Sequence, residues 1–152
     1  MTWLGKLLLP VMALLVGVLA GVGVFTFGYA NGWAYFGNDP ATCGQCHAMT
    51  PYLKAWEKGS HPDVADCNDC HAPHDSIVGK YVNKGENGFW HSLKFTTGDY
   101  PTNIQIRPHN ARVVEAACRY CHGNFTNDIE MLRHDGESVS CVFCHPNVGH
   151  ME

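Results

Sequence analysis

The sequence lacks charge near its amino end and lacks aliphatic residues over most of the rest. No charged residue occurs between Lys6 and Asp39. The formal net charge is −4, so there is no cationic excess to suggest a nucleic-acid partner. Beyond residue 42 aliphatic residues are sparse and turn formers are frequent, and a domain of about 110 residues built this way would be marginally stable on its side chains alone. Something other than aliphatic side chains should fill its centre.

The uncharged run at residues 7–30 is long enough to cross a bilayer, whose core of about 30 Å needs about 20 apolar residues in a helix. Aromatic residues flank the run, as at membrane interfaces. A cleaved signal peptide is the alternative, with Gly28 and Ala30 before the cleavage site, but the run exceeds the usual apolar length of about 7–15 residues. We therefore expect residues 1–37 to be a retained anchor in membrane lipid, with a single transmembrane helix at about residues 7–30.

The few charges near the anchor predict its orientation. Lys6 and the α-amino group are the only positive charges there, so the positive-inside rule places the amino end in the cytoplasm. Residues 38–152 then lie on the outer face of a bacterial inner membrane, in the periplasm. Ala13, Gly17 and Gly21 form a stripe of small residues that favours a homo-oligomer, although membrane helices also simply tolerate small residues.

All eight cysteines belong to four CxxCH motifs, at residues 43–47, 67–71, 118–122 and 141–145. CxxCH is the attachment sequence of c-type haem, in which two thiols bind the porphyrin and the histidine binds its iron. Zinc sites and disulfides also use paired cysteines, but neither explains a histidine after every second cysteine. The motifs predict four covalently bound haem c groups. Their thioether residues would be Cys43, Cys46, Cys67, Cys70, Cys118, Cys121, Cys141 and Cys144.

The spacing of the motifs indicates a duplicated two-haem unit, with haem pairs at residues 43–74 and 118–150. Haems so crowded nearly touch, which suits electron transfer and leaves little room for a substrate pocket. We expect a mainly α fold with much irregular chain: the anchor, then a small multihaem c-type cytochrome domain at 38–152 whose short helices pack round four haems. Electron-transfer haems usually take histidine or methionine as a second axial ligand. Six histidines outside the motifs are available: His61, His74, His91, His109, His134 and His150.

Residues 75–101, within the longest interval between motifs, predict a helix that begins after Ser76. Lys80, Lys84, Asn87 and His91 recur at three- and four-residue intervals and so share one face of that helix. This face is either solvated or turned toward a haem or a small polar ligand at the membrane surface.

The anchor and the four motifs, with CHxM at the first, resemble the NapC/NrfH family of membrane-bound quinol dehydrogenases. The resemblance covers the whole chain and includes CGQCHAM (43–49), CNDCHAPH (67–74), the 80–101 segment and CHPNVGH (144–150). It implies oxidation of menaquinol at the membrane and transfer of electrons through four haems to a soluble multihaem partner, the catalytic subunit of the ammonia-forming cytochrome c nitrite reductase. The chain would not itself reduce nitrite. A NapC-like or general periplasmic carrier serving another terminal reductase is the alternative.

The resemblance also implies the axial ligands. Met49, with His47 as the alternative, is implied for the first haem. His71, His122 and His145 correspond to the proximal ligands of the second, third and fourth haems. The implied distal ligands are His61 for the fourth haem and His150 for the third. For the second haem, the distal ligand is left open among His91, His134 and a lysine of the partner protein.

The quinol pocket is implied at Lys80 and Asn87, on the same helix face as Lys84 and His91. Some family members carry an aspartate where this chain has Asn87. Because asparagine cannot accept a quinol proton, the acceptor would be Glu86, His91, Lys84 or water.

Overall fold

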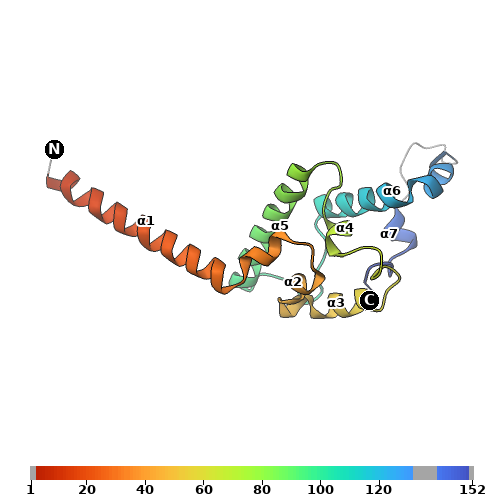
Figure 1. Ribbon diagram of the computed structural model, residues 1–152, viewed down its shortest axis with the longest axis horizontal. Helices are drawn as coiled ribbons and strands as arrows, with labels where there is room; N and C mark the ends of the chain where they lie inside the picture. Colours follow the sequence, from red (N-terminus) through yellow and green to blue (C-terminus); the bar gives the residue numbers. More distant parts are fainter. Residues whose placement is uncertain (1–2, 132–139, 151–152) are drawn as a thin grey trace. The chain divides into compact units, whose positions relative to one another are not determined.

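The computed structural model describes residues 3–131 and 140–150, and this part of the chain is helical, without a β-strand. The mainly α prediction is confirmed. The chain forms two compact units, Met1–Gly37 and Asn38–Glu152. Figure 1 labels the helices. Their bounds are α1 Trp3–Tyr29, η1 Gly32–Phe36, α2 Pro40–Gly44, η2 His47–Met49, α3 Thr50–Glu57, α4 Cys67–His71, α5 Ile77–Thr97, α6 Pro108–Met131 and α7 Cys141–Cys144, where η marks a 3-10 helix.

The first unit is built on the apolar helix α1. Its Lys6–Tyr29 segment has 24 residues and a mean hydropathy of 2.6, and none of its most apolar window is buried. At about 1.5 Å per residue the segment is about 36 Å long, compared with a bilayer core of about 30 Å. Pro10 lies inside the helix. The helix is long and apolar enough to cross a membrane.

An aromatic cluster follows α1. The Phe27 ring meets Trp33 edge-on with 5.1 Å between centroids, and Phe36 lies at 6.5 Å. The chain turns at Asn31, whose φ of 51° is left-handed. Gly32 is buried so close to the Phe27 ring that a Cβ would collide with it. Aromatic rings are enriched at membrane–water interfaces, so the cluster fits one end of a membrane span.

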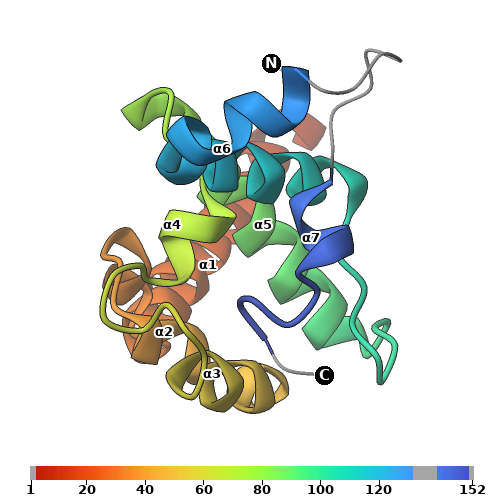
Figure 2. The same cartoon turned by 90° about the vertical axis from the view of Figure 1, so that its right-hand side faces the viewer.

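The second unit buries few of its own hydrophobic side chains. Among the described residues, the buried hydrophobic ones are Ala72, Val113 and Ala117, and no large side chain is fully buried. These three residues lie on α6 or directly after α4, and the two helices pack together (Figure 2). The polypeptide therefore supplies only part of an interior, as its low aliphatic content predicts.

Helix α5 has well-defined ends. The Ser76 hydroxyl accepts a hydrogen bond from the Gly79 N–H at 3.0 Å, which confirms the predicted start. Gly98 ends the helix in a left-handed conformation with φ of 70°. The Lys94 amine bonds the carbonyl and carboxylate of Asp99, at 3.1 and 2.9 Å. These contacts fix the register of the face that carries the proposed quinol residues.

Candidate haem and quinol sites

Two of the four CxxCH motifs occupy the short helices α4 and α7, the first motif begins at the end of α2, and each of these helices is capped by a polar side chain. The caps are Asp39 for α2, Asp66 for α4 and Ser140 for α7. The Asp66 carboxylate accepts the backbone N–H groups of Asn68 and Asp69, at 2.7 and 3.2 Å. The third motif lies within α6. Each motif is thus held by its own local capping or by a long helix, which the chain needs because such short helices are not stable alone.

The cysteines of the four motifs form a row in chain order. The Cys67 thiol hydrogen-bonds Cys43, which lowers the pKa of Cys43 to about 7 and raises that of Cys67. Burial raises the pKa of Cys118, and nearby Cys70 adds to the increase, while a hydrogen bond from Cys141 opposes it. Motif one therefore adjoins motif two, two adjoins three, and three adjoins four.

None of the eight cysteines forms a disulfide. Within residues 3–131 and 140–150 there is also no group of three or more His, Cys, Asp or Glu side chains arranged to hold a metal ion.

His61 lies beside the motif histidine His122. Their ring centroids are 6.2 Å apart and the ring planes meet at 80°. The loop that carries His61 is tied back by a hydrogen bond from the Trp56 indole to the Ala65 carbonyl, at 3.1 Å. The Ser60 hydroxyl bonds Nδ1 of His61 at 2.9 Å. Nδ1 is therefore occupied, and Nε2 is the nitrogen left for a metal.

His150 lies beside His71 in the same manner, with centroids 6.0 Å apart and planes at 25°. Nδ1 of His150 bonds the Tyr52 carbonyl at 3.3 Å, and the Tyr52 ring packs edge-on at 5.3 Å. Burial, then His150 and His91, lowers the pKa of His71 to about 4. Although protein groups surround the His71 ring, the residue is exposed to solvent. The imidazole is neutral at pH 7, which is the form that binds metals.

The spacing of both pairs suits an iron between the rings. A metal–nitrogen bond of about 2 Å on each side, and about 1 Å from each nitrogen to its ring centre, places opposed imidazole centroids about 6 Å apart. The rings turn freely about such bonds, so 25° and 80° are both compatible. A carbonyl or hydroxyl on the other nitrogen is the usual way to orient a ligand histidine. The donor set therefore fits bis-histidine haem.

These neighbours differ from the pairing that the resemblance implied. His61 lies beside the third motif's histidine, whereas the fourth haem was implied. His150 lies beside the second motif's histidine, whereas the third was implied. Chain spacing could not reveal this, because both contacts are made by loops that fold back from distant positions. In the described part of the chain no other histidine ring contacts His145. His134, an alternative for the second haem, lies outside the described residues.

The first motif presents its two candidate ligands differently. His47 is exposed, whereas Met49 is half-buried. Both belong to η2, in which the Met49 N–H donates to the Cys46 carbonyl at 2.8 Å. Within this single helical turn, Met49 is thus less exposed than His47.

The polar face of α5 divides into two parts. Near its start, Lys84 lies within electrostatic reach of Cys43 and Lys80. Burial and then Lys80 lower the pKa of Lys84, and Cys43 opposes the change. Further along, burial and then Arg107 lower the pKa of His91. The first part adjoins the first CxxCH motif, and the second part faces the beginning of α6.

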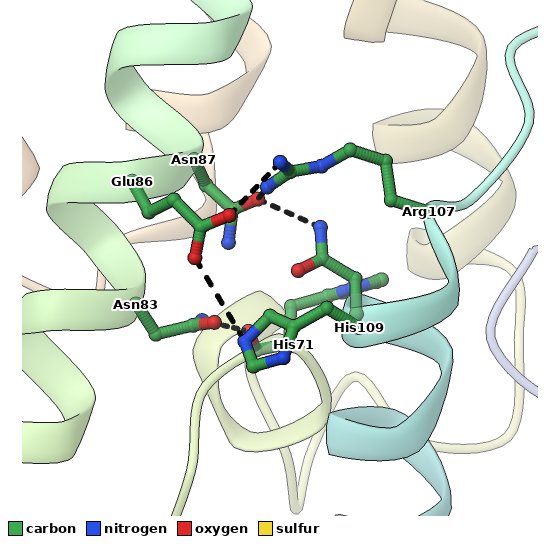
Figure 3. A network of polar contacts seen from close by, with 7 residues as sticks. His71, Asn83, Glu86, Asn87, Arg107 and His109 are labelled. Carbon is green, nitrogen blue, oxygen red and sulfur yellow. Dashed lines mark hydrogen bonds and ion pairs between the residues drawn. The ribbon is translucent and has the colours of Figure 1, made fainter.

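Asn87 is held in a network between α5 and α6 (Figure 3). Its Oδ1 accepts hydrogen bonds from Nη2 of Arg107 at 2.8 Å and Nδ2 of Asn110 at 2.7 Å. Arg107 also bonds Glu86 at 3.0 Å, and His109 lies 3.9 Å from the same carboxylate. Because its oxygen is already used twice, Asn87 acts here as a link between helices.

The same figure shows Asn83 reaching α4. This buried side chain donates from Nδ2 to the His71 carbonyl at 2.8 Å. Sequence reasoning missed Asn83, Arg107 and Asn110. Their partners are 12, 20 and 23 residues away. No local spacing pattern indicates such contacts, so only the folded chain reveals them.

His74 is engaged away from the iron-ligand pairs. Its Nε2 bonds the Asp69 carbonyl at 2.7 Å, and its ring stacks on Tyr120 with centroids 4.4 Å apart. It borders a cavity of about 400 Å³. The lining residues are Pro73, His74, Asp75, His109, Arg112, Val113, Ala116, Ala117 and Tyr120. At 3.6 residues per turn, the α6 members lie on the face opposite Cys118.

The chain matches known proteins over most of its length. The model of the NapC/NirT cytochrome c family, N-terminal region, matches residues 6–152. The cytochrome c-type protein NrfH of Wolinella succinogenes is 31% identical over 142 residues, which cover 88% of this chain and 80% of that protein. The cytochrome c nitrite reductase subunit NrfH of Nitratidesulfovibrio vulgaris is 33% identical over 109 residues, or 72% of this chain and 65% of that protein.

One solved structure has a similar fold. It is the crystal structure of the cytochrome c nitrite reductase NrfHA complex bound to the HQNO inhibitor. The matching chain superposes with a TM-score of 0.65 at 26% identity, and the match covers 92% of this chain and 90% of that one.

Proposed function

The chain belongs to the NapC/NirT cytochrome c family, and we propose that it is a single-pass membrane subunit that oxidises menaquinol and delivers electrons to a cytochrome c nitrite reductase. Its relatives are named as subunits of that reductase or as NrfH. The observation that carries the proposal is the row of four CxxCH motifs, adjacent in chain order. A continuous row suits the relay of electrons from one motif to the next.

The chain would hold four haems through its eight cysteines. When bound, these groups supply one-electron carriers whose potentials depend on the axial ligands. We assign Met49 to the first haem, His71 with His150 to the second, and His122 with His61 to the third. His145 binds the fourth. The distances within the two histidine pairs and the partial burial of Met49 support these assignments.

The fourth haem is then the one that lacks an internal distal ligand among the described residues. A lysine of the partner was one option that the family resemblance gave for the second haem. The position of His150 beside His71 supports His150 in that role, so the open position is proposed for the fourth haem. A haem at the end of the row is also the one that can meet a soluble partner.

The quinol would bind at the start of α5, beside the first motif. Lys80 and Lys84 can donate hydrogen bonds to the quinol oxygens. His91, on the same face, is neutral at pH 7 because its pKa is lowered, so it can accept a proton. Asn87 keeps α5 against α6 and takes no proton. Glu86, paired with Arg107 at the protein surface, can pass the proton on to solvent.

The orientation follows from the charges at the amino end. Lys6 keeps that end in the cytoplasm, and the haem domain lies in the periplasm. Two electrons from each quinol then leave the membrane on the side where a soluble nitrite reductase would be found.

The test is reduction of the purified protein by menaquinol in liposomes, followed by the reduced haem absorption band. We expect reduction of all four haems, and recovery of a multihaem reductase when the protein is purified from native membranes. If menaquinol leaves the haems oxidised while dithionite reduces them, the protein would be an electron carrier and not a quinol dehydrogenase. A partner of another class identified by mass would assign the chain to a different terminal enzyme.

A further inference from the structure

Glu115 joins the third and fourth haem-attachment motifs. It lies on α6 one turn before Cys118. Its Oε1 accepts hydrogen bonds from the Ser140 hydroxyl at 2.6 Å and the Val142 N–H at 3.3 Å, and its Oε2 accepts the Cys141 N–H at 2.9 Å. One carboxylate therefore holds the whole first turn of α7, from a position at least 25 residues earlier in the chain.

The carboxylate is charged where it makes these bonds. Burial raises the pKa of Glu115, but the hydrogen bonds from Ser140, Cys141 and Val142 lower it by more, so the net change is downward. Its side chain is 17% exposed, and Nη1 of Arg119 lies 3.9 Å away. A negative charge is thus kept close to two haem-attachment sites.

The fourth motif depends on this contact because its own helix is short. α7 spans only Cys141–Cys144. Its first backbone N–H groups have no partner within the helix, and a single turn is not stable by itself. Ser140 caps one of them, the Phe143 N–H, at 3.3 Å. Glu115 satisfies two more and orients the Ser140 hydroxyl.

We propose that Glu115 is a positioning residue for the fourth haem: it fixes the CVFC turn against α6, sets the placement of Cys141 beside Cys118, and puts a negative charge near the third and fourth haems. The inference rests on the proposed haem attachment and goes beyond it, since no motif includes this residue. A fixed negative charge stabilises the oxidised, more positive form of a haem, so it should lower the potential.

Two variants test the carboxylate. Glu115→Ala removes its charge and all of its hydrogen bonds, whereas Glu115→Gln removes the charge and keeps one acceptor oxygen, so it loses the bonds to either Oε1 or Oε2 and retains the others. The readouts are intact mass, which counts haems per chain, and a potentiometric titration followed by absorbance. Glu57→Gln, at the exposed end of α3, is the matched control.

We expect Glu115→Ala to yield a fraction of chains with three haems. Glu115→Gln should keep four haems and titrate with at least one potential higher than in the wild type, while Glu57→Gln matches the wild type. If the Glu115→Ala protein does not accumulate in the cell, the potentiometric titration of Glu115→Gln alone tests the inference. A Glu115→Gln curve that superimposes on the wild type would overturn the inference alone. A wild-type chain with fewer than four haems would overturn the proposed function, and this inference with it.

Discussion

The imidazole of His150 stands 6.0 Å from that of His71, with the ring planes 25° apart. The first lies near the carboxyl end of the sequence and the second in the second CxxCH motif. The contact closes the haem domain on itself, since His150 also bonds the Tyr52 carbonyl on α3. The contact between these two histidines is therefore made by the tertiary fold, between segments far apart in the chain.

Replacing His150 with alanine should remove the distal ligand of the second haem. We expect one of the four haems to change from low to high spin in the electron paramagnetic resonance spectrum, with four haems still present by mass. Replacement by methionine should keep six ligands and raise one potential, because a thioether is the weaker donor. The matched control is His74→Ala, since His74 is already bonded to the Asp69 carbonyl. Four low-spin haems in His150→Ala would refute the assignment.

The pairing of His61 with His122 can be tested by combining changes. His61→Ala and His122→Met should each alter one haem, and the double variant should still alter only one. Counting the altered haems by magnetic circular dichroism gives the answer. Two altered haems in the double variant would show that the histidines serve different irons, as in the pairing first implied by the family resemblance.

Replacing Met49 should change the spectrum of the first haem, whereas replacing His47 should leave it unchanged. Met49→Leu removes the only sulfur ligand, so the spectrum of one haem should change and the reduction of the protein by menaquinol should slow. His47→Ala leaves an exposed position and should retain both properties. An effect confined to His47→Ala would reverse the assignment.

Replacing His91 with alanine should slow menaquinol oxidation by about 100-fold, the usual contribution of a general base. Haem content and spectra should be unchanged. Asn87→Ala is the comparison variant, because this change breaks the contacts to Arg107 and Asn110 without removing a proton acceptor. We expect Asn87→Ala to reduce thermal stability more than it reduces the rate. A change of spin state in His91→Ala would show that His91 binds iron.

The sequence alone was sufficient for the features that are local. A run without charge predicts α1, and Ser76 predicts the start of α5. Each rests on a pattern within a few residues. The resemblance added the family, which the match over residues 6–152 confirms.

The features that sequence reasoning missed depend on long-range contacts. Glu115 bonds a segment 25 to 27 residues away, and Asn87 accepts its hydrogen bonds from Arg107 and Asn110. The two histidine pairs, His61–His122 and His71–His150, differ in the number of residues that separate their members. These contacts form between segments far apart in the chain, so no spacing pattern within a haem pair indicates them.

The near absence of a hydrophobic core has a consequence for biogenesis. With Ala72, Val113 and Ala117 as its buried hydrophobic residues in the described chain, the polypeptide has little to collapse around until porphyrin is attached. Maturation and folding would then be one process, and the amount of protein in the membrane should follow the cell's supply of haem more closely than its supply of transcript. Proteases outside the cytoplasm would clear whatever the attachment machinery had not yet loaded.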